Sequence, residues 1–122
     1  MTLRLVIPGT PIPLGRHRTG KGRTYLPARS RAYRTLIQTC WMASGRPSLG
    51  GLPFACSMRF YGLRANADLD NAIKAIMDSL NGLAFADDRQ LVCIAGAHRL
   101  PADADGPRCE VDLWPVDRQV AA

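Results

Sequence analysis

The chain has 122 residues, of which 47% are hydrophobic, and it carries a formal net charge of +6. A chain of this length fits one domain that buries roughly two thirds of its unfolded surface, so folding alone requires neither a disulfide nor a metal ion. The composition indicates a globular protein rather than a disordered one. No apolar run approaches the roughly 18 residues of a membrane span, and the apolar core of the N-terminal MTLRLVIPGT is too short for a signal peptide.

Charge is distributed unevenly along the chain. Residues 1–67 contain 11 Lys and Arg and no acid, whereas residues 68–122 contain all 10 acids and 5 Lys or Arg, so the two parts carry +11 and −5. A surface that only needs solubility usually intermixes the two signs. The separation favours one part that binds a polyanion and another with a local need for carboxylates. Chance clustering in a small basic protein is the alternative.

The four cysteines are widely spaced and include no C-x-x-C pair. Cys40, Cys56 and Cys93 lie in apolar stretches, where buried free cysteine is common. Disulfide frameworks are more usual in shorter secreted chains, and a zinc site requires closely paired ligands, which His17 and His98 also lack. We therefore expect reduced cysteines, no zinc and a cytoplasmic protein.

Alternating apolar residues predict a first strand that starts near Leu3 and is ended by Pro8-Gly9. Residues 10–27 then form a long connection in which recurring prolines and glycines exclude a regular helix. Its basic residues are Arg16, His17, Arg18, Lys21 and Arg23. Such long connections are usually functional or mobile. We expect this one to approach a phosphate backbone and to become ordered on DNA, with a disordered surface loop as the alternative.

Helical periodicity predicts a helix over Ala28–Ser44 with an apolar stripe along one side. Ser30 is its expected N-cap. Three arginines make its first turns strongly basic: Arg29, Arg31 and Arg34. After a break rich in Gly and Pro, residues 54–61 alternate between apolar and other side chains and predict a strand.

A second helix is predicted from about Asp70 to Asn81, with Asp70 as its N-cap and Asn81-Gly82 as its stop. Its core-facing stripe has i, i+3, i+4, i+7 spacing and consists of Ile73, Ile76, Met77 and Leu80. Strands follow near residues 90–99 and 108–115, joined by a polar loop. The order β-α-β-α-β-β predicts a single α+β domain over residues 1–116, with a mixed sheet of about four strands and two main helices, and a C-terminal tail over residues 117–122.

Two carboxylates and an ammonium gather at the start of the second helix. If the chain is extended up to the cap, Asp68 and Asp70 project to the same side. Lys74 and Asp78 follow at intervals of one helical turn above that face, while the apolar stripe points elsewhere, into the core. The pattern therefore predicts a cluster of charged groups that the other face of the helix anchors.

A third acid is expected from Asp87-Asp88, which precedes an apolar strand. Adjacent residues of an extended chain point opposite ways, so one of the two is expected to reach the cluster. Hard cations such as Mg²⁺ prefer a few carboxylates, with water and substrate phosphate completing the coordination. A bound ion would lower the pKa of a water molecule and neutralise charge at phosphorus, and Lys74 would contact the phosphate or orient the water.

Each of these features also has a simpler explanation. Asp70 can act as a helix cap and a partner of the helix dipole. The pairs Asp70–Lys74 and Lys74–Asp78 can be surface ion pairs that contribute about a few tenths of a kcal/mol each. Asp87-Asp88 can form a turn. The spacing of the residues leaves both explanations open.

The stretch D-L-D-N-x-x-K-x-x-x-D-x-L over residues 68–80, followed by D-D-x-Q-L-V over residues 87–92, closely resembles the RusA family of Holliday junction resolvases. The resemblance extends over most of the chain, through an initial strand, a Pro-rich turn, a basic loop and Tyr33-Arg34. It implies a homodimeric, magnesium-dependent endodeoxyribonuclease that cuts four-way junctions symmetrically. Many members of that family are encoded by phages or prophages.

Carried over residue by residue, the resemblance implies three metal-binding carboxylates and one essential lysine as the catalytic set: Asp68, Asp70, Asp88 and Lys74. It implies supporting roles at Asp87, Asn71 and Asp78. Relatives often carry asparagines after the prolines, where this chain has Leu14-Gly15-Arg16-His17-Arg18. That departure concerns DNA-sequence preference at the cleaved bond and not the chemistry.

Binding to DNA is expected to rest on backbone contacts, and hence to depend on salt, through Arg16, Arg18, Lys21, Arg23, Arg29, Arg31 and Arg34. Two equal nicks in a junction of approximate two-fold symmetry favour a C₂ homodimer, for which Tyr33, Ile37 and Trp41 are candidate interface residues. Mg²⁺ is the expected cofactor, with Mn²⁺ able to substitute. Two alternatives are a flap-cutting or other structure-selective nuclease with the same acids, and a non-catalytic DNA-binding protein.

Overall fold

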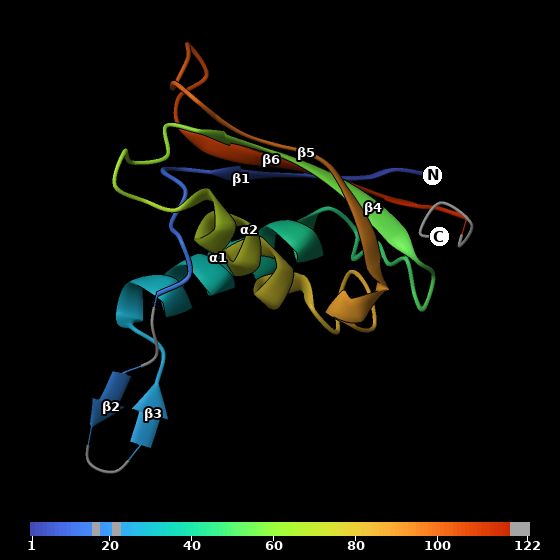
Figure 1. The fold of residues 1–122 in the computed structure, drawn as a ribbon, viewed down its shortest axis with the longest axis horizontal. Coiled ribbons are helices and arrows are strands. Elements are labelled where there is room, and N and C mark those ends of the chain that lie inside the picture. Colours follow the sequence, from blue (N-terminus) through green and yellow to red (C-terminus); the bar gives the residue numbers. More distant parts are fainter. Residues whose placement is uncertain (16–17, 21–22, 118–122) are drawn as a thin grey trace.

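Four strands form a mixed sheet in the computed structural model, which describes residues 1–15, 18–20 and 23–117, with the backbone alone for residues 18–20 and 23–25. The strands are β1 (Leu3–Pro8), β4 (Phe54–Tyr61), β5 (Leu91–Leu100) and β6 (Arg108–Pro115). Their order in the sheet is β1-β6-β4-β5. β6 is antiparallel to both of its neighbours, whereas β5 pairs with β4 in parallel. β1 and β5 are therefore the edges of the sheet (Figure 1).

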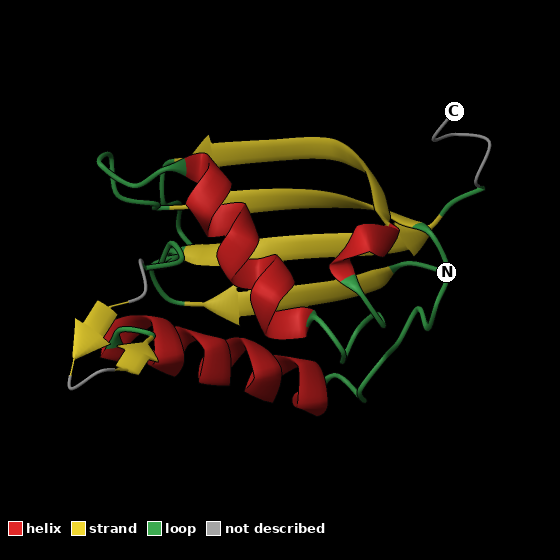
Figure 2. Cartoon of the chain, turned by 60° about the horizontal axis from the view of Figure 1, so that its bottom comes forward, coloured by secondary structure: helices red, strands yellow, loops and turns green. Residues whose placement is uncertain are grey.

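Two helices, α1 (Ala28–Ala43) and α2 (Leu69–Leu80), cover the same face of this sheet, as Figures 1 and 2 show. Parallel strands cannot be joined by a tight turn, and α2 is the crossover between β4 and β5. A single 3₁₀ turn, η1 (Asp88–Gln90), precedes β5. The predicted single α+β domain, its mixed sheet and its element order are confirmed.

The hydrophobic core lies between the helices and the sheet. Alternate residues of β1 and β6 are buried, as expected of strands with one covered face. Ile37 of α1 and Ile76 of α2 are fully buried against them. The rings of Phe54 and Phe85 stack with their centroids 4.7 Å apart, which closes the core beside the end of α2.

The three residues proposed as a dimer interface belong to this core instead. Tyr33, Ile37 and Trp41 are 6%, 0% and 8% exposed, because the apolar stripe of α1 faces the sheet and α2. Ser30 is likewise not the N-cap of α1. Pro27 takes that position, and the buried Ser30 hydroxyl accepts a hydrogen bond from the Gly15 N–H (3.1 Å).

The connection over residues 10–27 contains a short hairpin that the sequence analysis missed. β2 (Arg18–Gly20) pairs antiparallel with β3 (Arg23–Tyr25), and the hairpin lies beyond the start of α1, away from the sheet (Figure 1). A signal for it was present, because Gly20-Lys21-Gly22 separates two threonine-containing segments. Of the basic residues expected to bind DNA here, Arg16 and Lys21 lie outside the described residues.

Charges that are far apart in the sequence meet on the uncovered face of the sheet. Arg59 of β4 donates hydrogen bonds to Glu110 and Asp112 of β6, both at 3.0 Å. Arg4 of β1 approaches the same two carboxylates at 3.6 and 3.7 Å. Hydrogen bonds from Arg108 and Arg59 hold the pKa of Glu110 below its usual range. Part of the predicted basic half is therefore neutralised within the fold.

All four cysteines are free, with Cys56 and Cys109 buried and Cys40 and Cys93 partly buried. In the part of the chain that the structure describes, no helix is long and apolar enough to cross a membrane. Residues 118–122 lie outside that part, so the predicted tail over residues 117–122 stays a prediction.

Replacing Ile37 by Ala tests the place of α1 in the core. We expect the free energy of unfolding to fall by about 2–5 kcal/mol, because a fully buried isoleucine is truncated. Denaturant unfolding measures the loss. Met42→Ala, on the same helix but 44% exposed, is the control and should stay within about 0.5 kcal/mol of wild type. A stable Ile37→Ala protein that instead loses self-association would place Ile37 in an interface.

Candidate metal-dependent nuclease site

The start of α2 differs from the expected arrangement by one residue. Leu69 is the first helical residue, and Asp68 is the N-cap with an extended backbone (φ −77°, ψ 132°). Asp70 is therefore not the cap but lies in the first turn, so the two-residue alternation does not relate it to Asp68. The Asp68 side chain makes no capping hydrogen bond, while its backbone carbonyl accepts one from the Ala72 N–H (3.1 Å).

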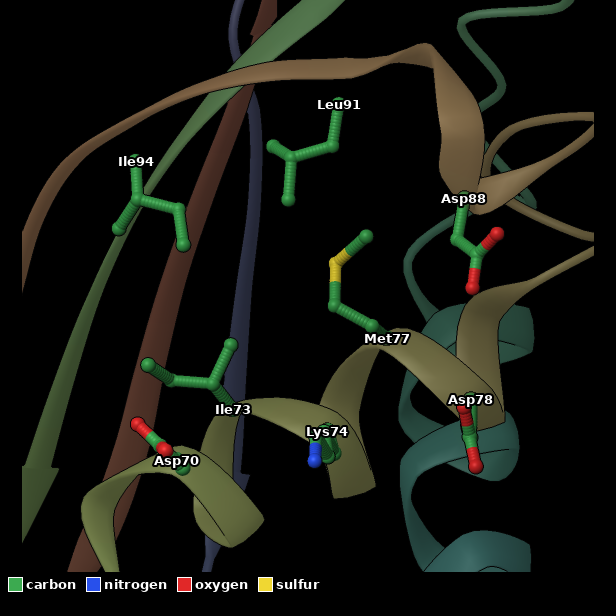
Figure 3. Close-up of a pocket in the computed structure, with 8 residues that line it drawn as sticks. All are labelled: Asp70, Ile73, Lys74, Met77, Asp78, Asp88, Leu91 and Ile94. Atoms are coloured by element: carbon green, nitrogen blue, oxygen red, sulfur yellow. The ribbon is translucent and has the colours of Figure 1, made fainter.

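One face of α2 forms the wall of a cavity of about 310 Å³, shown in Figure 3. Asp70, Lys74 and Asp78 line it at intervals of one helical turn, and Asp88 lines it from η1. All four residues are exposed. Asp70 lies at one end of the cavity, Asp78 and Asp88 lie at the other, and Lys74 lies between them. The predicted gathering of charged groups on one side of α2 thus occurs for Asp70, Lys74 and Asp78.

The charged groups along α2 do not neutralise one another. Among the described residues, Lys74 makes no ion pair or hydrogen bond with Asp70 or Asp78. The simpler explanation, two surface ion pairs along the helix, is therefore not realised in this structure. The ammonium and the Asp70 carboxylate remain available to a partner outside the chain.

Asp87 and Asp88 have different environments. Asp87 caps η1 by accepting a hydrogen bond from the Arg89 N–H (2.9 Å), and its second oxygen pairs with the Arg89 guanidinium (3.1 Å). Chiefly because of that guanidinium, the pKa of Asp87 is lowered to about 2. The pKa of Asp88 is raised, chiefly by its hydrogen bond with the Asp87 side chain and further by the negative charges of Asp87 and Asp78. Asp87 thus stabilises the turn, and Asp88 is the one that lines the cavity.

Gln90 fixes this turn to the neighbouring loop. Its amide nitrogen donates to the carbonyls of Gly50 and Leu52, both at 2.8 Å, and its amide oxygen accepts from the Asp87 N–H at 2.7 Å. Gln90 belongs to the D-D-x-Q pattern of residues 87–90, but no role for it was predicted from the sequence. The glutamine completes the capping box and so holds the backbone that carries Asp88.

Apolar side chains lie between the two ends of the cavity. Ile73 and Met77 of α2 face Leu91 and Ile94 of β5 across it, and the Ile94 residue is 49% exposed. The predicted core-facing stripe of α2 is confirmed for Ile76, Met77 and Leu80, which are buried, whereas Ile73 packs against the core but is only partly buried. The buried face of the helix consists of Ala72, Ala75, Ile76, Met77, Ser79 and Leu80.

The three predicted metal ligands do not meet within one chain. Asp68 does not line the cavity. Asp88 lies beside Asp78, and the eight helical steps from Asp70 to Asp78 span about 12 Å at about 1.5 Å per step. Over the described ranges, no three His, Cys, Asp or Glu side chains are close enough to hold a metal ion. The donors fit a hard divalent cation in kind, because they are carboxylates, but one chain does not bring three of them together.

Of the arginines expected to bind DNA from α1, Arg29 is exposed at the start of the helix. The Arg31 guanidinium donates to the Leu26 carbonyl. Arg34 is partly buried beside a small cavity between α1 and α2, and its Nε has no hydrogen-bond partner among the described residues. The basic connection also touches the helix that carries the acids, because the Leu14 N–H donates to the Asn71 carbonyl (2.9 Å).

Residues 8–113, nearly the whole chain, match the family model described as endodeoxyribonuclease RusA. No match to a curated protein was found.

Replacing Asp87 by Ala tests the electrostatics of the acid pair. The variant lacks both the hydrogen bond and the negative charge that raise the pKa of Asp88. We expect the pKa of Asp88 to fall towards the ordinary value for Asp, as measured by titrating its carboxyl ¹³C chemical shift. Asp103→Ala, which removes an exposed acid paired with Arg108 in another loop, is the matched control and should leave that titration unchanged. An Asp88 titration that is the same in Asp87→Ala and in wild type would contradict the coupling.

Proposed function

The chain belongs to the RusA family of endodeoxyribonucleases, and we propose that it is a magnesium-dependent enzyme that resolves Holliday junctions by paired symmetric cuts. The family consists of structure-specific nucleases that hydrolyse branched DNA, so a non-catalytic DNA-binding role is not favoured. The observation that supports the proposal most directly is the cavity that Asp70, Lys74 and Asp88 line together.

Family members depend in general on a divalent metal ion, and we assign its binding here to Asp68, Asp70 and Asp88. Carboxylate oxygens suit Mg²⁺, and Mn²⁺ accepts the same ligands. When bound, the ion supplies charge neutralisation at the phosphorus centre and a lowered pKa of water. The pKa of Asp88 is raised chiefly by its hydrogen bond with the Asp87 side chain and further by the negative charges of Asp87 and Asp78, and a cation would relieve the repulsion between these charges.

We assign Lys74 to the scissile phosphate. Lys74 is exposed on the cavity wall between Asp70 and Asp78 and forms no ion pair among the described residues. A flexible ammonium acts as a point charge on phosphate oxygens, so Lys74 would hold the phosphate against the carboxylates while Asn71 and Asp78 support the helix turns around it. Affinity for the DNA backbone would come from Arg29 and from the basic hairpin region.

A homodimer is part of the same proposal. Ile73, Leu91 and Ile94 form a partly exposed apolar area between the two ends of the cavity. A C₂ contact is self-complementary. If two copies of α2 met antiparallel over this area, Asp70 of one copy would approach Asp88 of the partner subunit, and two equal sites would form. Such packing would supply the third carboxylate that one chain does not bring to Asp70.

Asp70→Asn tests the chemistry. We expect loss of Mg²⁺-dependent cleavage of a synthetic four-way junction by at least about 100-fold, because a metal-binding carboxylate becomes neutral. Junction binding without metal should stay within about threefold of wild type, since backbone affinity comes from arginines. Gel assays of cleavage and fluorescence anisotropy measure the two.

Asp105→Asn, an exposed acid in the loop over residues 101–107, is the matched control for charge and should cleave like wild type. Flap and duplex substrates in the same assay separate junction resolution from general structure-selective cleavage. Equal cleavage by Asp70→Asn and wild type would refute the proposed site, and a preference for flaps would refute the proposed substrate.

Mixing two inactive variants tests the shared site. Heterodimers of Asp70→Asn with Asp88→Asn contain one intact site if each site takes Asp70 and Asp88 from different copies, and none if both come from one copy. We expect the mixture to regain single nicks in a junction, without paired cuts, and each variant alone to stay inactive. A mixture without nicks, in which mass spectrometry detects heterodimers, would show that each chain holds its own site.

A further inference from the structure

The segment that carries the chain from β4 to Asp68 is fixed at its start by Gly62. This glycine has φ +79°, a conformation that L side chains rarely adopt. A Cβ there would lie 3.0 Å from the Pro107 Cβ, so a side chain would also require Pro107 to shift. The Gly62 N–H donates to the Leu100 carbonyl (2.8 Å), which ties the turn to the end of β5.

Arg99 holds the remainder of this segment. It lies one residue before Leu100 on β5, opposite Phe60 in the parallel register. Its guanidinium donates through Nη1 to the Ala65 carbonyl (3.4 Å) and through Nη2 to the Ala67 carbonyl. These are two of the three carbonyls directly before Asp68.

Few other hydrogen bonds fix the backbone just before Asp68, whose own carbonyl accepts from the Ala72 N–H within α2. The Ala67 N–H donates to the Arg64 carbonyl (2.9 Å), but that bond lies within the turn. Among the hydrogen bonds of the described residues, those from Arg99 are the ones that join residues 64–67 to the sheet. The exposed Asp68 side chain makes no capping hydrogen bond of its own.

We propose that Arg99 is a positioning residue, which fixes the backbone of residues 65–67 and thereby sets where Asp68 and the first turn of α2 present their carboxylates. The inference rests on the proposed function of these acids. β5 would then position acids at both of its ends. The turn η1, which carries Asp88, directly precedes the first residue of β5, and Arg99 near the other end of β5 holds the loop before Asp68. A rigid strand thus relates the two groups of acids that α2 separates.

The planar guanidinium suits this task better than an ammonium. Its N–H groups form a fixed fork, so one side chain can donate to two carbonyls at once, whereas a lysine has a flexible stem and one nitrogen. Arg99→Lys should therefore restore part of the function that Arg99→Ala loses. Displacement of a catalytic group by about 1 Å can cost on the order of 100-fold in rate, so the expected effect is large although Arg99 touches no reacting atom.

The test compares Arg99→Ala, Arg99→Lys and Arg4→Ala as complete proteins. Arg4 is the matched control, since it is an arginine of the other edge strand, 61% exposed, that pairs with acids away from the cavity. Junction cleavage under saturating Mg²⁺ gives kcat. Amide hydrogen exchange over residues 64–69 without metal reports the loop directly, and thermal unfolding reports overall stability.

We expect Arg99→Ala to lower kcat by about 10–100-fold and to speed amide exchange over residues 64–69, with Arg99→Lys intermediate and Arg4→Ala like wild type. The salt dependence of junction binding should not change, because no phosphate contact is lost. Unchanged exchange over residues 64–69 in Arg99→Ala would overturn the inference. So would a salt slope reduced by about one, since Arg99 would then contact DNA.

Two further outcomes distinguish a failure of the role assigned to Arg99 from a failure of the proposed nuclease site. If Asp70→Asn is inactive but Arg99→Ala cleaves at the wild-type rate, the inference fails and the proposed site stands. If Asp70→Asn cleaves normally, the proposed site fails whatever Arg99 does. Loss of activity in Arg99→Ala together with a general loss of thermal stability, and without rescue by Arg99→Lys, would make Arg99 merely structural and would overturn the inference.

Discussion

The parallel pairing of β4 with β5 is the constraint on which the rest of the structure depends. Two parallel neighbours require a crossover, and α2 makes it by running back along the sheet from the end of β4 to the start of β5. The acids that precede and begin α2 therefore lie at one end of the sheet, and Asp88 lies at the other. The cavity lies along this path, because Ile73 of α2 and Ile94 of the edge strand β5 both line it.

Electrostatics distinguishes the cavity beside α2 from the uncovered face of the sheet. Two arginines of the sheet form ion pairs with acids. Arg59 pairs with Glu110 and Asp112, and Arg108 pairs with Asp103 and Glu110. None of these ion pairs includes an acid of the cavity, and the one cation on the cavity wall of α2, Lys74, is left unpaired in the described structure. Carboxylates that form no ion pair within the described structure favour an external cation, as the proposed metal-dependent cleavage requires.

Much of the fold was predictable because periodicity reports which face of an element is covered. The apolar residues that alternate along β1 and β6, and those that recur at helical spacing along α2, form the buried faces of these elements. The hairpin of β2 and β3 was missed because strands of three residues carry almost no periodic signal. The interface role of Tyr33, Ile37 and Trp41 was wrong because an apolar stripe does not say whether its partner is the same chain or another one.

The sequence by itself determined the two main helices, the four strands of the sheet, their order and the family, because local periodicity and the motif over residues 68–92 are properties of neighbouring residues. Only the tertiary structure decided how these groups meet in space. It paired Arg4 and Arg59 with acids of β6, it separated Asp70 from Asp88 along α2, and it brought Arg99 to the loop before Asp68. Such distances depend on strand order and crossover, which join residues that are remote in the chain and leave no local pattern.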